Sequence, residues 1–302
     1  MIYNNVLELI GKTPILKLNN IQDNNNIYLK LEKYNSGGSI KDRAVLGMIE
    51  DLMKENKIKQ GDTIVEATSG NTGIALSMIG KVKGLNIIIV MPSSMSKERI
   101  DLMKAYGAEV ILTNEGGMQA SIDKAIELVN SNESYKSLKQ FENESNPKKH
   151  YNTTAIEIYE DVENIDIFVA GIGTGGTISG IGKYLKEKNP NIRVIGVEPE
   201  SSPLISKGYS GAHKIQGIGA NFIPKNLDMS IIDEIITVKD EDAINTIKLL
   251  GEKEGVLVGI SSGANVFASI EIGKKYKGKN IVTVSPDGIE KYLSMDIFKK
   301  SF

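Results

Sequence analysis

Short apolar runs rich in β-branched residues alternate along the chain with longer segments whose apolar residues recur at the period of a helix. A strand, a helix and a further strand normally form a unit in which the two strands are parallel. The alternation therefore predicts an α/β fold with a mainly parallel sheet. We expect strands at 27–31, 63–67, 86–91, 109–112, 166–170, 193–198 and 280–285, and helices at 42–57, 71–82, 96–105, 118–129, 153–163, 177–187, 241–254 and 264–276.

Two stretches lack either period. Residues 131–152 are rich in Asn, Ser and Lys, which fits a domain junction or a solvated loop. Residues 199–228 are too long for a simple connection, and loops of that length in a compact domain are usually functional.

The charge balance favours a small-molecule partner. The 302 residues carry 36 basic and 38 acidic side chains, a net charge of -2, so no field draws the protein to nucleic acid or to a membrane. The absence of cysteine excludes disulfides and thiolate chemistry, and two distant histidines, His150 and His213, do not predict a metal site. The first residues lack a signal sequence and no apolar run could span a bilayer, so we expect a cytoplasmic protein.

A glycine cluster follows the expected strand at 166–170. Gly171, Gly173, Gly175 and Gly176 open a helix, where backbone amides and the helix N-terminus favour a phosphate. Three of these glycines also fit the dinucleotide pattern G-x-G-x-x-G, with Glu198 placed to bind a ribose, so an NAD-dependent dehydrogenase using the Gly171–Gly176 loop is an alternative. A tight turn without a ligand is the third interpretation.

Two further loops suggest ligand contacts. Residues 66–78 read EATSGNTGIALSM, where Thr68 and Ser69 are either caps of the next helix or donors for a substrate carboxylate. Residues 34–45 read YNSGGSIKDRAV and place Lys41 directly after a glycine turn. Most lysines are solvated surface charges, but one held beside such a loop is a candidate Schiff-base amine.

Taken together, these loops resemble the cysteine synthase (O-acetylserine sulfhydrylase) and cystathionine β-synthase family, pyridoxal-phosphate enzymes of fold type II. The resemblance runs in order through IGKTP, GGSIKDR, EATSGNTG, QFENESNPKKHY, GIGTGGT, QGIGA, EGVLVGISSGA and PDGIEKYLS, nearly the whole chain. It implies two open, twisted, mainly parallel sheets flanked by helices, as in the tryptophan synthase β-like fold, with the active site between two domains. A smaller, mobile N-terminal α/β domain would span 35–148, and 1–34 with 149–302 would form the larger C-terminal domain.

The resemblance also implies site roles. Lys41 would form the internal aldimine with pyridoxal 5'-phosphate and move the α-proton, Asn71 would bind the phenolic oxygen, and Ser261 would lie at the pyridine nitrogen. The phosphate would be bound by Gly173, Thr174, Gly175, Gly176 and Thr177, and the substrate by Thr68, Ser69, Gly70, Thr72, Gln140 and Gly217.

The implied reaction is β-replacement on a small amino acid through an α-aminoacrylate intermediate: O-acetyl-L-serine and sulfide giving L-cysteine and acetate. A neutral serine at the ring nitrogen makes the ring a weaker electron sink, which suits β-elimination. The alternative within the family takes L-cysteine, releases hydrogen sulfide and adds a second thiol to give lanthionine or cystathionine. A non-catalytic protein on the same fold is a further possibility. The resemblance also implies a homodimer and a docking site for the C-terminus of serine acetyltransferase.

The sequence departs from the common family pattern at three places. Residues 286–292 read PDGIEKY where relatives commonly have PDSGERY, so the serine after Asp287 is missing. Asn221 stands where a glycine is frequent, and Ser36 where proline is usual. A polar Asn221 near the substrate mouth could change which leaving group or nucleophile is accepted.

Overall fold

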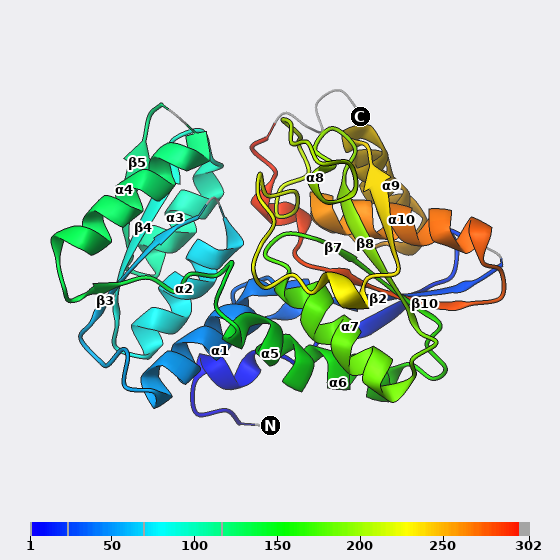
Figure 1. Cartoon of the computed structure of the whole chain (residues 1–302), viewed down its shortest axis with the longest axis horizontal. Helices are drawn as coiled ribbons and strands as arrows, with labels where there is room; N and C mark the ends of the chain where they lie inside the picture. Colours follow the sequence, from blue (N-terminus) through cyan, green and yellow to red (C-terminus); the bar gives the residue numbers. More distant parts are fainter. Residues whose placement is uncertain (1, 23, 69, 116, 296–302) are drawn as a thin grey trace.

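The computed structural model describes residues 2–22, 24–68, 70–115 and 117–295, and its strands form two separate sheets (Figure 1). The larger sheet has the order β1 (Ile15–Leu18), β2 (Asn26–Leu31), β10 (Asn280–Ser285), β7 (Ile167–Gly171), β8 (Arg193–Pro199), β9 (Glu234–Val238). The smaller has the order β5 (Glu109–Thr113), β4 (Asn86–Pro92), β3 (Thr63–Ala67), β6 (Tyr135–Lys136). Neighbouring strands are parallel except β1 and β2, which confirms the predicted mainly parallel α/β fold.

Helices cover both faces of each sheet because alternate strand residues point to opposite sides. In the larger sheet, Val169 packs with α9 (Asp240–Glu254) and α10 (Ile260–Lys275), whereas Phe168 packs with α6 (Thr154–Asp161) and α7 (Gly176–Lys188). In the smaller sheet, Ile89 packs with α1 (Lys41–Lys54), α2 (Asn71–Val82) and α3 (Lys97–Ala105), and Ile88 with α4 (Gly117–Ser131). Each sheet therefore has apolar cores on both faces. Short 3-10 helices lie at η1 (Val6–Leu9), η2 (Glu32–Tyr34), η3 (Met229–Ile231) and η4 (Ile289–Lys291).

The stretch 131–152, expected to be irregular, contains strand β6 and helix α5 (Ser145–Asn152). Helix α5 packs against α1 on one side and α7 on the other, so it joins the helices of the two sheets (Figure 1). Its buried side chains include Asn146 and His150, which are polar. A solvated loop was therefore the wrong interpretation of this stretch.

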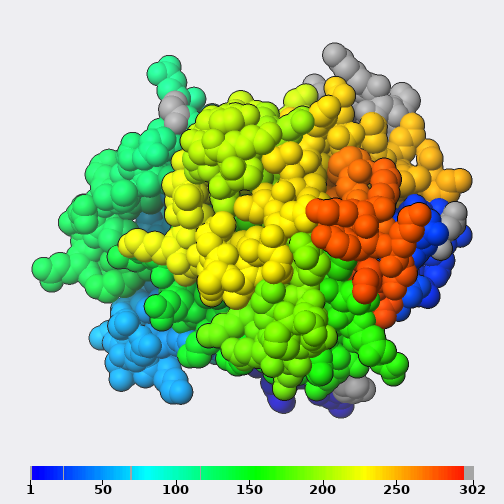
Figure 2. All heavy atoms as spheres, turned by 45° about the vertical axis from the view of Figure 1, so that its right-hand side comes forward, coloured from blue at the N-terminus to red at the C-terminus, as the bar shows by residue number. Residues whose placement is uncertain are grey.

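The remaining differences are at sheet edges and helix ends. Strands β1 and β9 and the short helix α8 (Leu204–Lys207) were not predicted, and helix α10 begins four residues before the expected start. Apart from α8, residues 199–228 are largely irregular, as expected, and Figure 2 shows their yellow-green and yellow atoms on the surface. Within the described ranges, no helix combines the length and the apolar character needed to cross a bilayer.

A buried cluster of charges joins the beginning of α1 to the larger sheet. Arg43, 1% exposed, binds Glu32 at 2.7 Å and Glu157 at 2.6 Å, and Lys30 binds Glu157 at 2.9 Å. Burial alone would raise the pKa of Glu157, but hydrogen bonds from Arg43 and Lys30 outweigh it and lower the pKa to about 2. The cluster thus fixes α1, and with it Lys41, against β2 and α6.

The lowered pKa of Glu157 predicts a loss of stability in acid. A depressed carboxylate pKa stabilises the fold above the ordinary value of 4.5, and this stabilisation is lost as the pH falls towards about 2. We expect urea denaturation to show that the free energy of unfolding of the wild type falls by about 2 kcal/mol over that pH range, and that of Glu157→Gln by much less. The exposed Glu163→Gln controls for removal of a carboxylate, and equal pH slopes in Glu157→Gln and the wild type would contradict the assignment.

Candidate functional site

The site is built from loops that follow the carboxyl ends of β2, β3, β7 and β10. Strand β10 pairs with both β2 and β7, so the loops after these three strands begin side by side. Residues before α1 meet residues after β10 directly, because Ile40 N–H donates to Pro286 O at 2.8 Å and Ser39 pairs with Asp287. Ligands of open α/β sheets bind at this edge.

Lys41 is the first residue of α1 and its side chain is partly buried. Burial lowers the pKa of Lys41, and the carboxylate of Asp287 opposes that shift. An amine with a lowered pKa has a larger neutral fraction, which is the form that attacks an aldehyde. The position predicted for a Schiff-base lysine therefore has the electrostatic environment that this chemistry needs.

The turn before Lys41 is held by side chains from two elements. Gly37 N–H donates to the buried Asp42 at 2.5 Å, while Lys291 donates to Gly37 O at 3.2 Å and to Gly38 O at 2.8 Å. Burial raises the pKa of Asp42 to about 7, although the bond from Gly37 N–H opposes the shift. The backbone that aims Lys41 is thus fixed by Asp42 and Lys291.

Asn71 begins α2 and lies between two charged side chains. Its Nδ2 donates to Asp287 Oδ2 at 2.7 Å, and its Oδ1 accepts from Lys291 Nζ at 3.1 Å. Asp287 also accepts from the hydroxyl of Tyr292 at 2.7 Å. Sequence reasoning noted the altered motif 286–292 but missed that Asp287 and Lys291 contact a predicted cofactor residue.

The predicted substrate residues of the β3 loop lie beside Gln140. The Thr72 hydroxyl donates to Gln140 Oε1 at 2.8 Å, which leaves the Nε2 group of Gln140 as a donor. Thr68 is buried and accepts from Gly70 N–H at 3.3 Å. Helix α2 has Gly70 as its N-cap residue, and no described side chain caps the helix, so the interpretation of Thr68 as a cap is wrong. Ser69 lies outside the described residues.

Glu66 positions the segment that carries Gln140. It is 6% exposed and accepts from Ser137 Oγ at 2.9 Å and from Leu138 N–H at 3.1 Å. Burial raises the pKa of Glu66 to about 7. Nothing in the local sequence points to this role, because the partners lie far along the chain, beyond β5 and α4.

The glycine loop after β7 packs tightly against its neighbours. A Cβ at Gly173 would lie 2.2 Å from Gly217 O, and one at Gly176 would lie 2.0 Å from Asn146 Oδ1. Gly175 has φ +81°, a conformation that favours glycine. These contacts explain why the loop has glycine at these positions. The loop leads directly into α7, whose first backbone N–H groups are where an anion would bind.

Two threonines of this loop are fixed by helix α5. Thr174 Oγ1 accepts from Asn146 Nδ2 at 3.0 Å, and Thr177 Oγ1 lies 3.4 Å from His150 Nε2. Burial, with the charges of Arg43 and Lys41, lowers the pKa of His150 well below its ordinary value, so the ring is neutral. His150 is therefore a polar neighbour of the predicted phosphate loop.

Ser261 and Gly217 are neighbours. Ser261 lies in the first turn of α10, is 3% exposed and would be 3.8 Å from a Cβ at Gly217. Among the described residues, no other atom lies within 4 Å of that Cβ, so the structure leaves room at this glycine. The next serine, Ser262, instead accepts from Ser285 Oγ at 3.0 Å.

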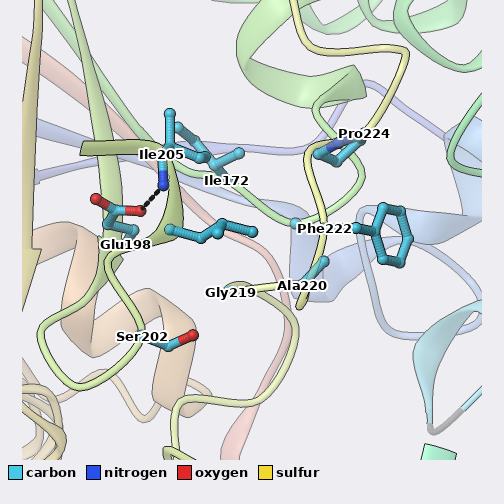
Figure 3. Close-up of a pocket in the computed structure, with 10 residues that line it drawn as sticks. Ile172, Glu198, Ser202, Ile205, Gly219, Ala220, Phe222 and Pro224 are labelled. Carbon is cyan, nitrogen blue, oxygen red and sulfur yellow. Dashed lines mark hydrogen bonds between the residues drawn. The ribbon is translucent and has the colours of Figure 1, made fainter. Parts of the chain in front are cut away.

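Glu198 is not available to bind a ribose. It is 1% exposed, and its two oxygens accept from Ile205 N–H and Ser206 N–H, both at 3.0 Å (Figure 3). A pocket beside it is lined by Ile172, Gly173 and residues of the 219–224 segment, among others. Because the carboxylate already holds the start of α8, the dinucleotide interpretation loses its ribose ligand.

The described residues fit pyridoxal phosphate. An amine of lowered pKa, a fixed amide, a glycine loop at a helix start and a neutral hydroxyl are carried by the loops and helix starts that form the site. These groups match the aldehyde, phenolic oxygen, phosphate and ring nitrogen in number and chemical type.

Comparison with known proteins agrees with this assignment. Residues 6–287 match the family model described as pyridoxal-phosphate dependent enzyme. Cysteine synthase B of Campylobacter jejuni is 52% identical over 98% of this chain and 99% of its own length. A hydrogen sulfide-producing enzyme of Fusobacterium nucleatum has a TM-score of 0.93 and 50% identity, covering 96% of this chain and 100% of that one. An O-acetyl serine sulfhydrylase of Entamoeba histolytica has a TM-score of 0.95 and 40% identity, covering 99% and 92%. With a family match and close relatives over nearly its whole length, the chain belongs to the pyridoxal-phosphate-dependent enzymes of fold type II.

Proposed function

We propose that this protein is a cysteine synthase that converts O-acetyl-L-serine and sulfide to L-cysteine and acetate. The observation that carries the proposal is the 52% identity to a cysteine synthase over 98% of the chain. The geometry supports it, because the amine and the anion cradle lie at the carboxyl edge of the larger sheet. The loop after β3, which carries the predicted carboxylate residues, reaches that edge where Asn71 contacts Asp287. Family membership, together with the occupied Glu198, excludes the dehydrogenase alternative.

Bound pyridoxal phosphate supplies an aldehyde for amine substrates and an electron-withdrawing ring that acidifies their α-C–H bond. Lys41 would attach the cofactor and would take and return the α-proton at Nζ. The burial that lowers its pKa favours the neutral amine, which both tasks need. Asn71 donates to the phenolic oxygen, and residues Gly173 to Thr177 bind the phosphate.

The substrate carboxylate is held by Thr68, Ser69, Gly70, Thr72 and Gln140. Thr72 orients the Gln140 amide so that its Nε2 donors are available, which supports this role. Gly217 forms the opposite wall, where its missing side chain leaves room for the reacting amino acid. The neutral hydroxyl of Ser261 accepts or donates at the ring nitrogen without adding a charge, which suits loss of a β-substituent.

We further propose that residues 35–148 form a smaller domain that closes on the larger one, formed by 1–34 and 149–302. Helix α3 already contacts the larger domain: Ser294 Oγ donates to Glu98 at 2.6 Å, and Arg99 donates to Gln216. The Arg99 guanidinium also lies 4.8 Å from the Tyr292 ring centre. Closure would exclude water from the reaction and so prevent hydrolysis to pyruvate and ammonia.

A second candidate uses L-cysteine as substrate, releases hydrogen sulfide and adds a second thiol to give lanthionine or cystathionine. Two observations support this second reaction: the similarity to a hydrogen sulfide-producing enzyme, and the presence of Asn221. Asn221 is exposed on a segment tied to the predicted substrate loop, since Phe222 packs on Phe141 at 4.8 Å and Asn226 Nδ2 donates to Gln140 O at 2.8 Å.

The two candidates differ in the donor that they consume. We expect the purified holoenzyme to form cysteine from O-acetylserine and sulfide with a kcat/KM at least about tenfold above that for lanthionine formation from cysteine. Product chromatography with each donor and acceptor pair measures this ratio. If the cofactor-loaded enzyme forms no cysteine from O-acetylserine and sulfide, the first candidate is removed. Asn221→Gly then tests whether Asn221 is responsible for the different substrate choice. A homodimer, a cytoplasmic location and docking of a serine acetyltransferase C-terminus stay predictions from the family resemblance.

A further inference from the structure

Asn71 lies between a buried ammonium and a buried carboxylate. Asp287 is 0% exposed and accepts from Asn71 Nδ2, whereas Lys291 is 3% exposed and donates to Asn71 Oδ1. A carboxylate only accepts hydrogen bonds and an ammonium only donates them. The two charges therefore permit a single orientation of the amide, with one N–H of Nδ2 still available.

Lys291 has three donors, and three acceptors take them. Besides Asn71 Oδ1, these are the carbonyl oxygens of Gly37 and Gly38, which lie in the turn before Lys41. Gly38 has φ +77°, and a Cβ there would lie 3.1 Å from Lys291 Nζ. One side chain thus connects the first residue of α2 to the turn that aims Lys41.

Burial of Lys291 is costly and brings no direct ion pair. Among the residues that the structure describes, no carboxylate lies within 4.0 Å of its ammonium. An ammonium taken out of water without a close counter-charge destabilises a fold. Stability therefore does not explain why a buried lysine stands at position 291. Its contacts with Asn71 and with the turn before Lys41 do explain it.

More distant charges also act on the Lys291 ammonium. Burial lowers its pKa, and the carboxylates of Asp287, Asp42 and Glu290 oppose that shift, whereas the guanidinium of Arg99 adds to it. Removal of this ammonium therefore changes the field in which the neighbouring groups of the site titrate.

We propose that Lys291 and Asp287 are positioning residues for the cofactor, which act by fixing the Asn71 amide and the turn that carries Lys41. The inference rests on the proposed role of Asn71 as a cofactor ligand. It assigns a role to the segment 286–292, where this chain differs from the common PDSGERY pattern. Lys291 stands at the place of the arginine in that pattern, so arginine is the conservative replacement.

The test compares two lysines that donate to backbone carbonyls. Lys291→Met removes the proposed contacts. Lys186→Met is the control, because Lys186 lies in the last turn of α7, at the end away from the glycine loop, and donates to Ile192 O at 3.1 Å. Each apo-protein is titrated with pyridoxal phosphate, and the pH dependence of the cofactor absorbance and the thermal midpoint are recorded. Lys291→Arg tests rescue, and Asn71→Ala with Lys291→Met completes a double-mutant cycle.

We expect Lys291→Met to weaken cofactor affinity about tenfold or more and to shift the pH profile, which corresponds to the loss of a charged hydrogen bond. Lys186→Met should lower the thermal midpoint, because it removes the ion pair with Asp233, while keeping affinity within about twofold. Lys291→Arg should stay within about threefold of the wild type. In the Asn71→Ala background the Lys291→Met effect should fall to about a third or less.

The inference is overturned if Lys291→Met matches Lys186→Met in affinity and pH profile, or if its full effect persists without the Asn71 amide. These outcomes leave the proposed function intact, because the wild type still binds the cofactor. A wild-type apo-protein that takes up no pyridoxal phosphate would instead remove the proposed function itself.

Discussion

Replacement of Lys41 by alanine is expected to leave a folded protein without covalently attached cofactor and with less than about a thousandth of the wild-type rate of cysteine formation. Alanine is a good helix former, so α1 should still begin at this position. The variant loses both the amine that attaches the cofactor and the base that moves the α-proton. Borohydride reduction followed by peptide mass spectrometry locates the attachment in the wild type and its absence in the variant.

The exposed Lys104→Ala is the control for loss of a lysine, and it should keep both adduct and activity. Lys291 is a second, buried amine in the site, so borohydride reduction of the wild type also shows which of Lys41 and Lys291 carries the cofactor. An adduct on the Lys291 peptide would keep the cofactor site and contradict the role of Lys41.

Gly173→Ala is expected to weaken pyridoxal phosphate binding about tenfold to a hundredfold. The new Cβ would lie 2.2 Å from Gly217 O. The position of a Cβ is fixed by its own backbone and Gly217 O is a backbone atom, so one loop must move away from the other. The phosphate loop and the wall opposite Ser261 would be displaced together. Titration of the apo-protein measures the affinity, and a phosphate-free analogue, pyridoxal, shows how much of the loss arises at the phosphate.

Gly208→Ala is the matched control, because this glycine has φ +80° and an added Cβ would have no described atom within 4 Å. It should cost about 1 kcal/mol of stability from backbone strain and leave cofactor affinity unchanged. Unchanged affinity in Gly173→Ala would mean that the contact with Gly217 is dispensable for the site.

The pattern of apolar residues in the sequence was enough to predict the strands that are apolar throughout. Strand β4 (Asn86–Pro92) is buried on both faces and was found nearly to the residue. Edge strands β1 and β9 are only partly buried, and their pattern is correspondingly weak. Helix α5 was missed because its buried side chains are polar, so no apolar stripe marks the face that packs between α1 and α7.

The site shows the same limit. Lys41 and the glycine loops stand out locally, since each follows a strand and opens a helix. The partners that fix them, such as Glu66, Asn146 and Lys291, are ordinary polar residues from distant parts of the chain. Their roles depend on which strands become neighbours, and the chain order alone does not give that.

The order of the larger sheet has a consequence for biosynthesis. Strand β10, the last of the described strands along the chain, lies between β2 and β7. Asn280 pairs with Asn26, which is 254 residues earlier, and Ile281 pairs with Ile167, which is 114 residues earlier. All four strands of the smaller sheet fall within 63–136 and can pair while the chain is still growing. The sheet that carries the amine's turn and the anion loop cannot close until residue 285 has left the ribosome. Coenzyme loading must therefore follow the synthesis of β10, and nascent chains arrested before residue 280 should be free of the coenzyme.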